Sequence, residues 1–201
     1  MHLLCVLGPP AVGKMTVGRA VCDLTGYRLF HNHVTIEPLI TLFGYGTPSF
    51  TRLNSMIRRE VMVEAVAADL PGLVFTYAAD FDNPEDLEHL RWLIEPVLEA
   101  AIRVDAVELS APLDVRLARE GLPDRVEHKP SKRDVGWARE HVLELDARAR
   151  FNTVAQAPVD QGGWPWSWLP HLALDNGHGD AQRTAERIVD GLGLPLQRPV
   201  Q

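Results

Sequence analysis

Short apolar runs alternate along the chain with longer segments whose apolar residues recur every three or four positions. The short runs are typical of buried strands, and the longer segments are typical of helices with one buried face. Helix boundaries are marked by Gly, Pro and capping residues, as at Asn83-Pro84. The runs predict five strands, at 2–7, 27–30, 73–77, 102–109 and 171–175. The periodic segments predict helices at 14–24, 34–42, 50–70, 84–101, 112–120, 131–151 and 180–192.

Strands that alternate with helices imply βαβ units and a parallel sheet. We therefore expect an α/β fold, a three-layer sandwich whose five-stranded, mainly parallel sheet is flanked by helices. The length of 201 residues fits one domain, placed at 1–195, with a loose tail at 196–201. Ligands of such sheets bind beyond the carboxyl ends of the strands. Candidate site residues are accordingly sought directly after each strand.

Composition narrows the class of protein. Apolar residues make up 46% and charged residues 23%, which excludes a mainly disordered chain. The net charge of -7 argues against a nucleic-acid partner, and the apolar runs are too short to span a membrane. Cys5 and Cys22 both lie in apolar stretches, so we expect reduced, buried thiols in a cytoplasmic protein. Oligomeric state stays open between monomer and homodimer.

The strongest motif is Gly8-Pro9-Pro10-Ala11-Val12-Gly13-Lys14, which has the form GxxxxGK between a strand and a helix. In such a loop (Walker A) the backbone N–H groups and the helix N-terminus bind phosphate oxygens, and the lysine adds positive charge. The sequence thus predicts nucleotide binding at residues 8–16, with Lys14 also catalytic. No guanine-specific motif is visible, so ATP is the expected nucleotide. The predicted cofactor-binding residues are Gly8, Pro10, Ala11, Val12, Gly13, Lys14, Met15 and Thr16.

The loop departs from the motif at Met15, where Ser or Thr normally ligates Mg²⁺. A thioether is a poor ligand for a hard cation that prefers oxygen. Thr16 follows, but a helix turns about 100° per residue, so its hydroxyl need not reach the same place. Either Mg²⁺ is held by phosphates, water and other residues, with Thr16 and Asp80 as candidates, or the chemistry is weakened.

The stretch GPPAVGKMTVGR resembles the start of shikimate kinase and of related nucleoside-monophosphate kinases, whose pattern is GxxGxGKSTxGR. The stretches GPPAVGKMT, FHNH and HKPSKRD also resemble bacterial shikimate-kinase-like proteins described as AAA-family ATPases. The resemblance implies a P-loop kinase fold in which ATP phosphorylates a small molecule. It also implies that Asn176, after the last strand, lies against the adenine.

The acceptor side differs from shikimate kinase. Two acids follow the second strand in that family, whereas His31 and His33 stand here. Neutral histidine still accepts a proton, but it supplies no negative charge; a plain polar turn is the alternative. Arg58 corresponds loosely to the family's acceptor-binding arginine. These differences predict that His31, His33 and Arg58 bind an acceptor other than shikimate.

Asp80 and Asp82 follow the third strand. In the resembling kinases an acid near this position holds magnesium through water, and a carboxylate here can instead act as a base. We take Asp80 as a catalytic and metal-binding candidate and Asp82 as a substrate-binding one. Their other interpretation is loop solvation and helix capping.

A basic stretch after the fourth strand stands out in this acidic chain. In the resembling kinases a mobile lid closes here, and its guanidinium groups stabilise the charge of the transferring phosphoryl. We expect a lid at 119–133 with Arg119 and Arg125 as catalytic residues, against the alternative of a solvated charged face. Trp164, Trp166 and Trp168 form a further candidate, interpreted as anchors of a loop rather than as a stacking platform.

These observations favour a phosphotransferase that moves the γ-phosphate of ATP to a small molecule. Met15 motivates an alternative, a nucleotide-binding regulator or slow NTP hydrolase. A nucleic-acid-binding module is the third hypothesis, and the net charge opposes it.

Overall fold

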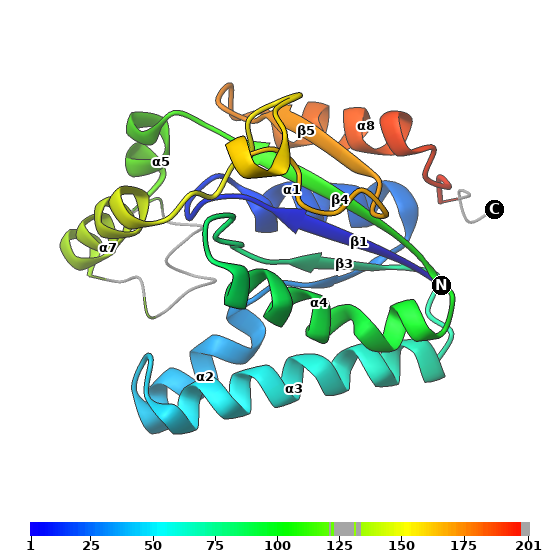
Figure 1. Ribbon diagram of the computed structural model, residues 1–201, viewed down its shortest axis with the longest axis horizontal. Coiled ribbons are helices and arrows are strands. Elements are labelled where there is room, and N and C mark those ends of the chain that lie inside the picture. Colours follow the sequence, from blue (N-terminus) through cyan, green and yellow to red (C-terminus); the bar gives the residue numbers. More distant parts are fainter. Residues whose placement is uncertain (121, 123–130, 132–133, 198–201) are drawn as a thin grey trace.

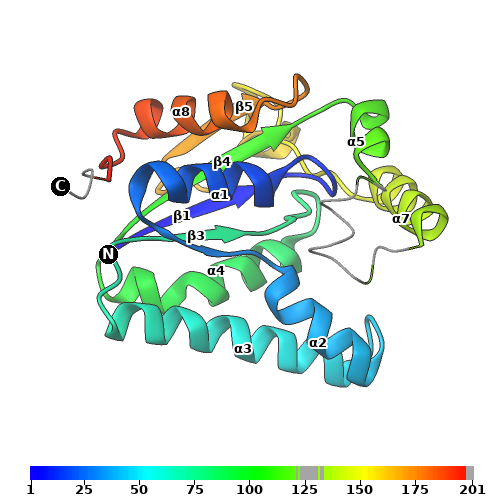
Figure 2. The same cartoon turned by 180° about the vertical axis from the view of Figure 1, so that it is seen from behind.

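The computed structural model describes residues 1–120, 122, 131 and 134–197, and its sheet forms the centre of the molecule (Figures 1 and 2). All paired strands run parallel, in the order β2-β3-β1-β4-β5. The predicted α/β sandwich is therefore confirmed, and its sheet is parallel throughout the described pairs. The strands are β1 (His2–Leu7), β2 (Arg28–Phe30), β3 (Leu73–Thr76), β4 (Arg103–Ser110) and β5 (His171–Asp175).

Helices cover both faces of this sheet (Figure 2). Two of them, α1 (Lys14–Thr25) and α8 (Ala181–Leu192), pack together on one face. The other face is covered by α4 (Pro84–Glu99), and α3 (Pro48–Ala67) packs on α4. The remaining helices lie toward the carboxyl ends of the strands: α2 (His33–Phe43), α5 (Leu113–Arg119) and α7 (Val135–Arg148). A single 3₁₀ turn, η2 (Val159–Gln161), interrupts the long segment before β5.

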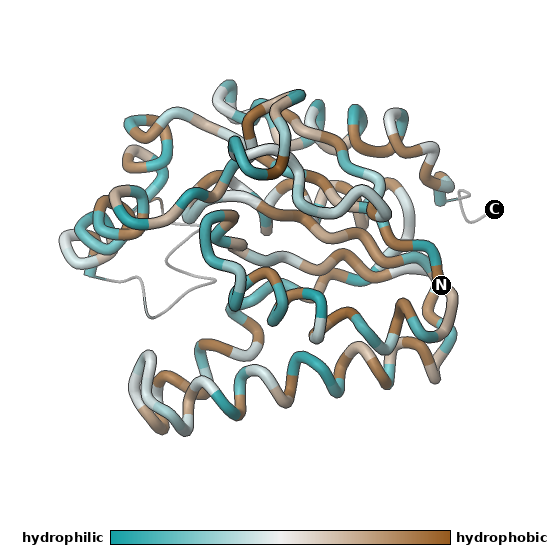
Figure 3. Tube along the Cα trace, in the orientation of Figure 1, coloured by the Kyte–Doolittle hydropathy of each residue, from teal (hydrophilic) through white to brown (hydrophobic). Residues whose placement is uncertain are grey.

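The core lies in two layers because β1 is buried on both faces. Successive side chains of a strand point to opposite faces, so Leu3, Cys5 and Leu7 pack toward α4. Leu4 and Val6 pack toward α1 and α8. The strands are accordingly drawn largely in the apolar colour in Figure 3. Burial of this central strand fixes where its carboxyl end, and thus the loop after it, must lie.

Element boundaries differ from the sequence prediction mainly before α7. The predicted helix at 131–151 begins only at Val135 and ends at Arg148. Its N-cap is Asp134, whose side chain accepts a hydrogen bond from the N–H of Trp137 at 3.0 Å. Ser131 lies before this helix, and its N–H and hydroxyl donate to Glu37. None of the helices that the structure describes is long and apolar enough to cross a membrane.

Candidate functional site

The loop after β1 curls tightly because three of its residues adopt positive φ. Gly8 has φ 131° and Gly13 has φ 106°, and Ala11 also lies in the left-handed region at 63°. A Cβ at Gly8 would lie 2.3 Å from the carbonyl oxygen of Leu109, which belongs to the backbone of β4. Glycine is therefore required at Gly8 both by backbone conformation and by the close approach of β4. The loop then enters α1 directly at Lys14.

Lys14 is nearly buried, and its ammonium group lies over this loop. Its Nζ donates to the carbonyl oxygens of Gly8 at 2.5 Å and Pro9 at 2.8 Å. These bonds hold the positive charge of Lys14 beside the loop, at the N-terminus of α1. A helix N-terminus and an ammonium group at one place favour an anion such as phosphate.

A second set of hydrogen bonds ties the loop to the end of α5 and to the connection between β5 and α8. The carbonyl oxygen of Val12 accepts from Asn176 Nδ2 at 2.7 Å and from Arg119 Nη1 at 2.9 Å. Arg119 Nη2 also donates to the carbonyl of Asn176 at 2.7 Å, and Thr184 Oγ1 donates to Asn176 Oδ1 at 2.8 Å. Burial lowers the pKa of Arg119, and the nearby Asp175 opposes this shift. Arg119 and Asn176 thus position the phosphate loop through its backbone.

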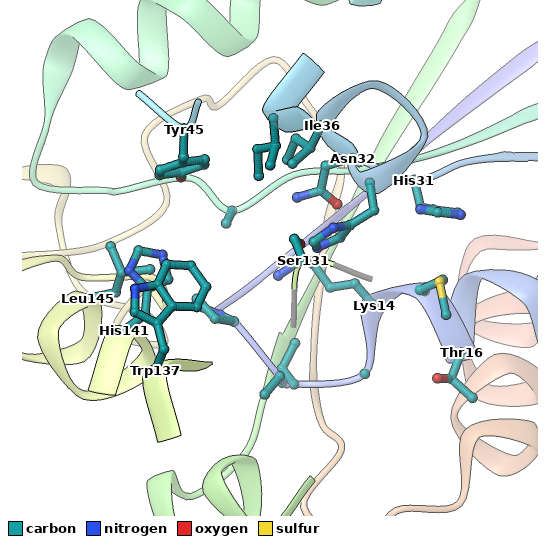
Figure 4. A pocket seen from close by; sticks show the side chains of 18 residues that line it. Lys14, Thr16, His31, Asn32, Ile36, Tyr45, Ser131, Trp137, His141 and Leu145 are labelled. Carbon is teal, nitrogen blue, oxygen red and sulfur yellow. The ribbon is translucent and has the colours of Figure 1, made fainter. Parts of the chain in front are cut away.

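A cavity of about 180 Å³ opens beside the loop (Figure 4). One part of its wall is residues 10–16, which include Lys14, Met15 and Thr16. The turn between β2 and α2 supplies His31, Asn32 and His33, and the turn after β3 supplies Ala78. The structure therefore brings the predicted phosphate loop and both predicted histidines to one cavity. The remaining wall consists of Ile36, Ile40, Tyr45, Ser131, Trp137, His141 and Leu145.

His33 is held by a carboxylate at the edge of this cavity. Its Nδ1 lies 2.7 Å from Glu37 Oε1, one turn further along α2. Glu37 also accepts from the N–H of Ser131 at 2.9 Å and from its hydroxyl at 2.7 Å. Burial acts to raise the pKa of Glu37, but the hydrogen bonds from His33 and Ser131 outweigh it and lower the pKa to about 2. Glu37 is therefore ionised at neutral pH and orients the His33 ring.

Sequence reasoning missed Glu37 and Ser131 as a pair because 94 residues separate them. It also missed the aromatic part of the wall, formed by Tyr45, Trp137 and His141. The spacing of His33 and Glu37, four residues apart on a predicted helix, was the one signal that could have found Glu37. No local signal links Tyr45 to α7.

Arg58 lies behind the β2–α2 turn and does not line the cavity. Its Nε donates to Thr35 Oγ1 at 3.1 Å and its Nη2 to the carbonyl of Asn32 at 3.3 Å. Burial lowers the pKa of Arg58. Thr76 Oγ1 donates to Asn32 Oδ1 at 2.7 Å, which fastens the same turn to β3. The structure thus gives Arg58 a contact with the turn that carries His31 and His33.

Asp80 and Asp82 lie away from the cavity wall. Asp80 Oδ1 accepts from the N–H of Arg150 at 3.0 Å, and Asp82 Oδ1 accepts from Arg150 Nε at 2.9 Å. Both acids therefore join the turn after β3 to the segment after α7. The structure does not bring them to Lys14, and their predicted roles at substrate and metal stay predictions.

The basic stretch is only partly described. Arg125 and most of the predicted lid at 119–133 lie outside the described residues. Of the described part, Arg116 is buried and pairs with Asp146 of α7, while Arg119 contacts the phosphate loop. Both described arginines of this stretch therefore make contacts within the protein, Arg116 with α7 and Arg119 with the loop after β1.

The tryptophan-rich segment packs on the sheet layer that faces α4. Trp164 stacks on His171 with ring centroids 3.9 Å apart, and its Nε1 donates to the carbonyls of Trp166 and Leu169. Glu108 of β4 is buried beneath this segment and accepts from Asn152 and Thr153. Burial acts to raise the pKa of Glu108, but these bonds and one from His171 lower it. The segment is anchored to the body of the protein, as a loop with bulky anchors would be.

No family model matches the chain, and no curated protein matches it. Solved structures do match over almost the whole length. Shikimate kinase from Acinetobacter baumannii, in complex with shikimate, has a TM-score of 0.55 and 16% identity, covering 95% of this chain and 92% of its own. APS kinase from Mycobacterium tuberculosis, in complex with AMPPNP and APS, has a TM-score of 0.56 and 18% identity, covering 96% and 97%.

The tunicamycin resistance protein of Deinococcus radiodurans is a third match, with a TM-score of 0.55 and 18% identity over 99% of this chain and 100% of its own. At these identities the likeness concerns the fold. This chain has the P-loop kinase fold that these small-molecule kinases share. The resemblance to shikimate kinase is therefore confirmed at the level of the fold.

Proposed function

We propose that this protein is a phosphotransferase that moves the γ-phosphoryl group of ATP to a hydroxyl of a small molecule other than shikimate. The observation that carries the proposal is one cavity that joins the phosphate loop to the histidines of the β2–α2 turn. A nucleotide and an acceptor bound at these two walls would meet at Lys14. The kinases that share the fold support the same class of reaction.

The phosphates would bind at residues 8–16. Backbone N–H groups of the loop and the N-terminus of α1 would bind their oxygens, with Lys14 adding a full charge. Lys14 would exchange its bonds to the carbonyls of Gly8 and Pro9 for phosphate oxygens. Asn176 and Arg119 would act indirectly, by fixing the carbonyl of Val12. Arg125 is kept as a candidate for stabilising the transferring group.

His33 is the proposed proton acceptor. When Nδ1 carries the hydrogen that Glu37 binds, Nε2 presents a lone pair to the acceptor hydroxyl. The hydroxyl oxygen then bonds to the γ-phosphorus, the bond from that phosphorus to the bridging oxygen breaks, and ADP leaves. The hydroxyl proton passes to Nε2 of His33. Glu37 is a positioning residue that fixes the ring and favours its protonated form.

The described residues do not fit a magnesium site held by the protein. Of the predicted ligands, Thr16 lines the cavity, but Asp80 is bonded to Arg150; Met15 stands at the usual hydroxyl position, and none of the described cavity residues is Asp or Glu. No group of three His, Cys, Asp or Glu side chains that could hold a metal ion occurs in the part of the chain that the structure describes. We therefore assign the protein itself no metal-dependent step, and Mg²⁺ would enter as the counter-ion of ATP.

The proposal is tested by ADP release from Mg-ATP, first without acceptor and then with sugars, nucleosides, nucleotides, shikimate-like acids and aminoglycosides. One class should stimulate release, and Lys14→Met should lower the stimulated rate about 100-fold or more. Arg187→Met removes an exposed cation of α8 and should leave the rate unchanged. Hydrolysis that no compound stimulates would favour the slow NTP hydrolase, and binding without turnover would favour the regulator.

A further inference from the structure

The wall of the cavity that faces the phosphate loop is built largely from rings and branched side chains (Figure 4). Tyr45 lies on one side, and Trp137, His141 and Leu145 lie together on another, across the cavity from Thr16. These residues come from the α2–α3 connection and from α7, with Ile36 and Ile40 added by α2. Neither the phosphates nor the proton transfer described above uses this part of the wall.

The rings have a defined mutual geometry. Trp137 and His141 stack with centroids 5.1 Å apart and an interplanar angle of 6°. Tyr45 meets His141 edge-on, at 5.9 Å and 85°. The wall therefore presents ring faces in two nearly perpendicular directions. A flat ligand can stack on one face and meet the other with its edge, which are the two favourable arrangements of aromatic rings.

Two of these rings remain exposed to water. Tyr45 is 56% and Trp137 is 42% exposed, and neighbouring Leu42, Phe43 and Leu143 are exposed as well. Exposed apolar surface gathered at the rim of a cavity is typical of a ligand-binding groove. A ligand that covers these rings would remove their apolar surface from water, and this burial would contribute to the free energy of binding.

The described residues of this wall are mostly aromatic or aliphatic, which favours an uncharged ring. Apart from histidine, none of its described residues carries an ionisable acid or base near neutral pH. Two described carboxylates border it: Glu37 is bonded to His33 and Ser131, and Glu144 Oε2 lies 4.0 Å from His141 Nδ1. An anion would therefore lose its hydration here without gaining an opposite charge from the described residues of this wall.

We propose that the acceptor carries an uncharged, planar heteroaromatic ring that stacks on Trp137 and meets Tyr45 edge to face, while its hydroxyl lies beside Lys14 and His33. This inference rests on the proposed function and names the class of its acceptor. A heteroaromatic ring joined to a hydroxylated sugar, as in a nucleoside, has both parts. Trp137 and Tyr45 are then residues that determine specificity.

The first test compares acceptors that differ only in the ring. ADP release from Mg-ATP is measured with adenosine, guanosine, cytidine, uridine and methyl riboside. At least one nucleoside should stimulate release, and methyl riboside should not. If methyl riboside or a ring-free acid stimulates release as strongly, the inference is wrong although the proposed function stands. If ATP binds but no compound of this or the wider panel stimulates release, the proposed function fails as well.

The second test changes the wall. Trp137→Ala should raise the KM of the stimulating nucleoside about 5- to 100-fold, as expected for loss of ring stacking, with the KM of ATP unchanged. Trp137→Phe keeps a ring face and should raise it less, which separates stacking from misfolding. Trp168→Ala removes an exposed indole outside the cavity wall and is the control. An unchanged nucleoside KM in a folded Trp137→Ala variant would overturn the assignment.

Discussion

Met15 occupies the helix position whose side chain, in the usual phosphate-loop motif, supplies a hydroxyl to Mg²⁺. The Met15 side chain lines the cavity and is nearly buried, so this position of the loop offers a thioether and no side-chain oxygen. If Met15 limits turnover, Met15→Ser should raise the rate of ADP release and lower the Mg²⁺ concentration that half-saturates it. Met15→Leu, which supplies no oxygen, should leave both unchanged. A rate that does not rise in Met15→Ser would show that Met15 is not the limiting residue.

Glu37 makes a pH-dependent contribution to stability. Its pKa is lowered to about 2 in the folded protein, against about 4.3 in an unfolded chain. The contribution is therefore complete above about pH 4.3 and is lost as pH falls toward 2. At pH 7, Glu37→Gln should be less stable by about 1–3 kcal/mol, because His33 and Ser131 lose an ionised acceptor.

Urea unfolding measured from pH 7 down to pH 3 checks this expectation. The difference between wild type and Glu37→Gln should shrink as the pH falls below about 4.3. Glu99→Gln, which removes an exposed carboxylate of α4, serves as the control and should show no such convergence. Free energies of unfolding that stay parallel for wild type and Glu37→Gln would contradict the assigned pKa.

At the scale of single residues, the sequence predicts a candidate best when its motif lies within a few consecutive positions. Lys14 and the glycines of the loop could be found because seven consecutive residues carry the whole motif. The surroundings of Asp80 could not be predicted, because its partner Arg150 lies 70 residues further along the chain. The hydrophobic pattern placed Asp80 after a strand, but it did not show which group would donate a hydrogen bond to its carboxylate.

At the scale of elements, the phosphate loop is held by the connection between β5 and α8. Asn176 is buried and contacts both the carbonyl of Val12 and the hydroxyl of Thr184. Asn176→Ala should destabilise the protein by about 1–3 kcal/mol, because it leaves buried groups without partners. It should also raise the KM of ATP more than that of the acceptor, because it loosens the loop and leaves the β2–α2 turn intact.

Thr184→Val is the matched control for Asn176→Ala. It removes the donor to Asn176 Oδ1 and keeps the contact of Asn176 with Val12. We therefore expect a loss of stability without the rise in the KM of ATP, measured by urea unfolding and by initial rates. An ATP KM that is equal in wild type and Asn176→Ala would mean that the loop keeps its shape without this contact.

Strand and helix positions followed from the hydrophobic pattern because burial on the sheet sets the period of each element. The β1 prediction at 2–7 and the β5 prediction at 171–175 agree with the structure. The start of α7 did not follow, since Ser131 and Asp134 are both good N-caps. The structure uses Asp134 as the cap, whereas Ser131 donates to Glu37, a residue 94 positions away that no local pattern links to it.

At the scale of the whole molecule, the cavity is a product of topology. The strand order brings the loop after β1 beside the turns that follow β2 and β3, and α7 closes the opposite side. The cavity wall opposite the loop is thus assembled from segments within residues 31–45, from Ser131 and from residues 137–145. No spacing along the chain encodes that meeting, which is why the loop after β1 could be predicted and the aromatic wall could not.

The central claim is that this protein transfers a phosphoryl group to a small molecule. The most direct measurement incubates the protein with ATP labelled with ³²P at the γ position and the compound that best stimulates ADP release. The account predicts that label appears in the acceptor in equal amount to the ADP formed, and that Lys14→Met slows this transfer about 100-fold or more. Label recovered only as inorganic phosphate, or transfer at the wild-type rate in Lys14→Met, would contradict it.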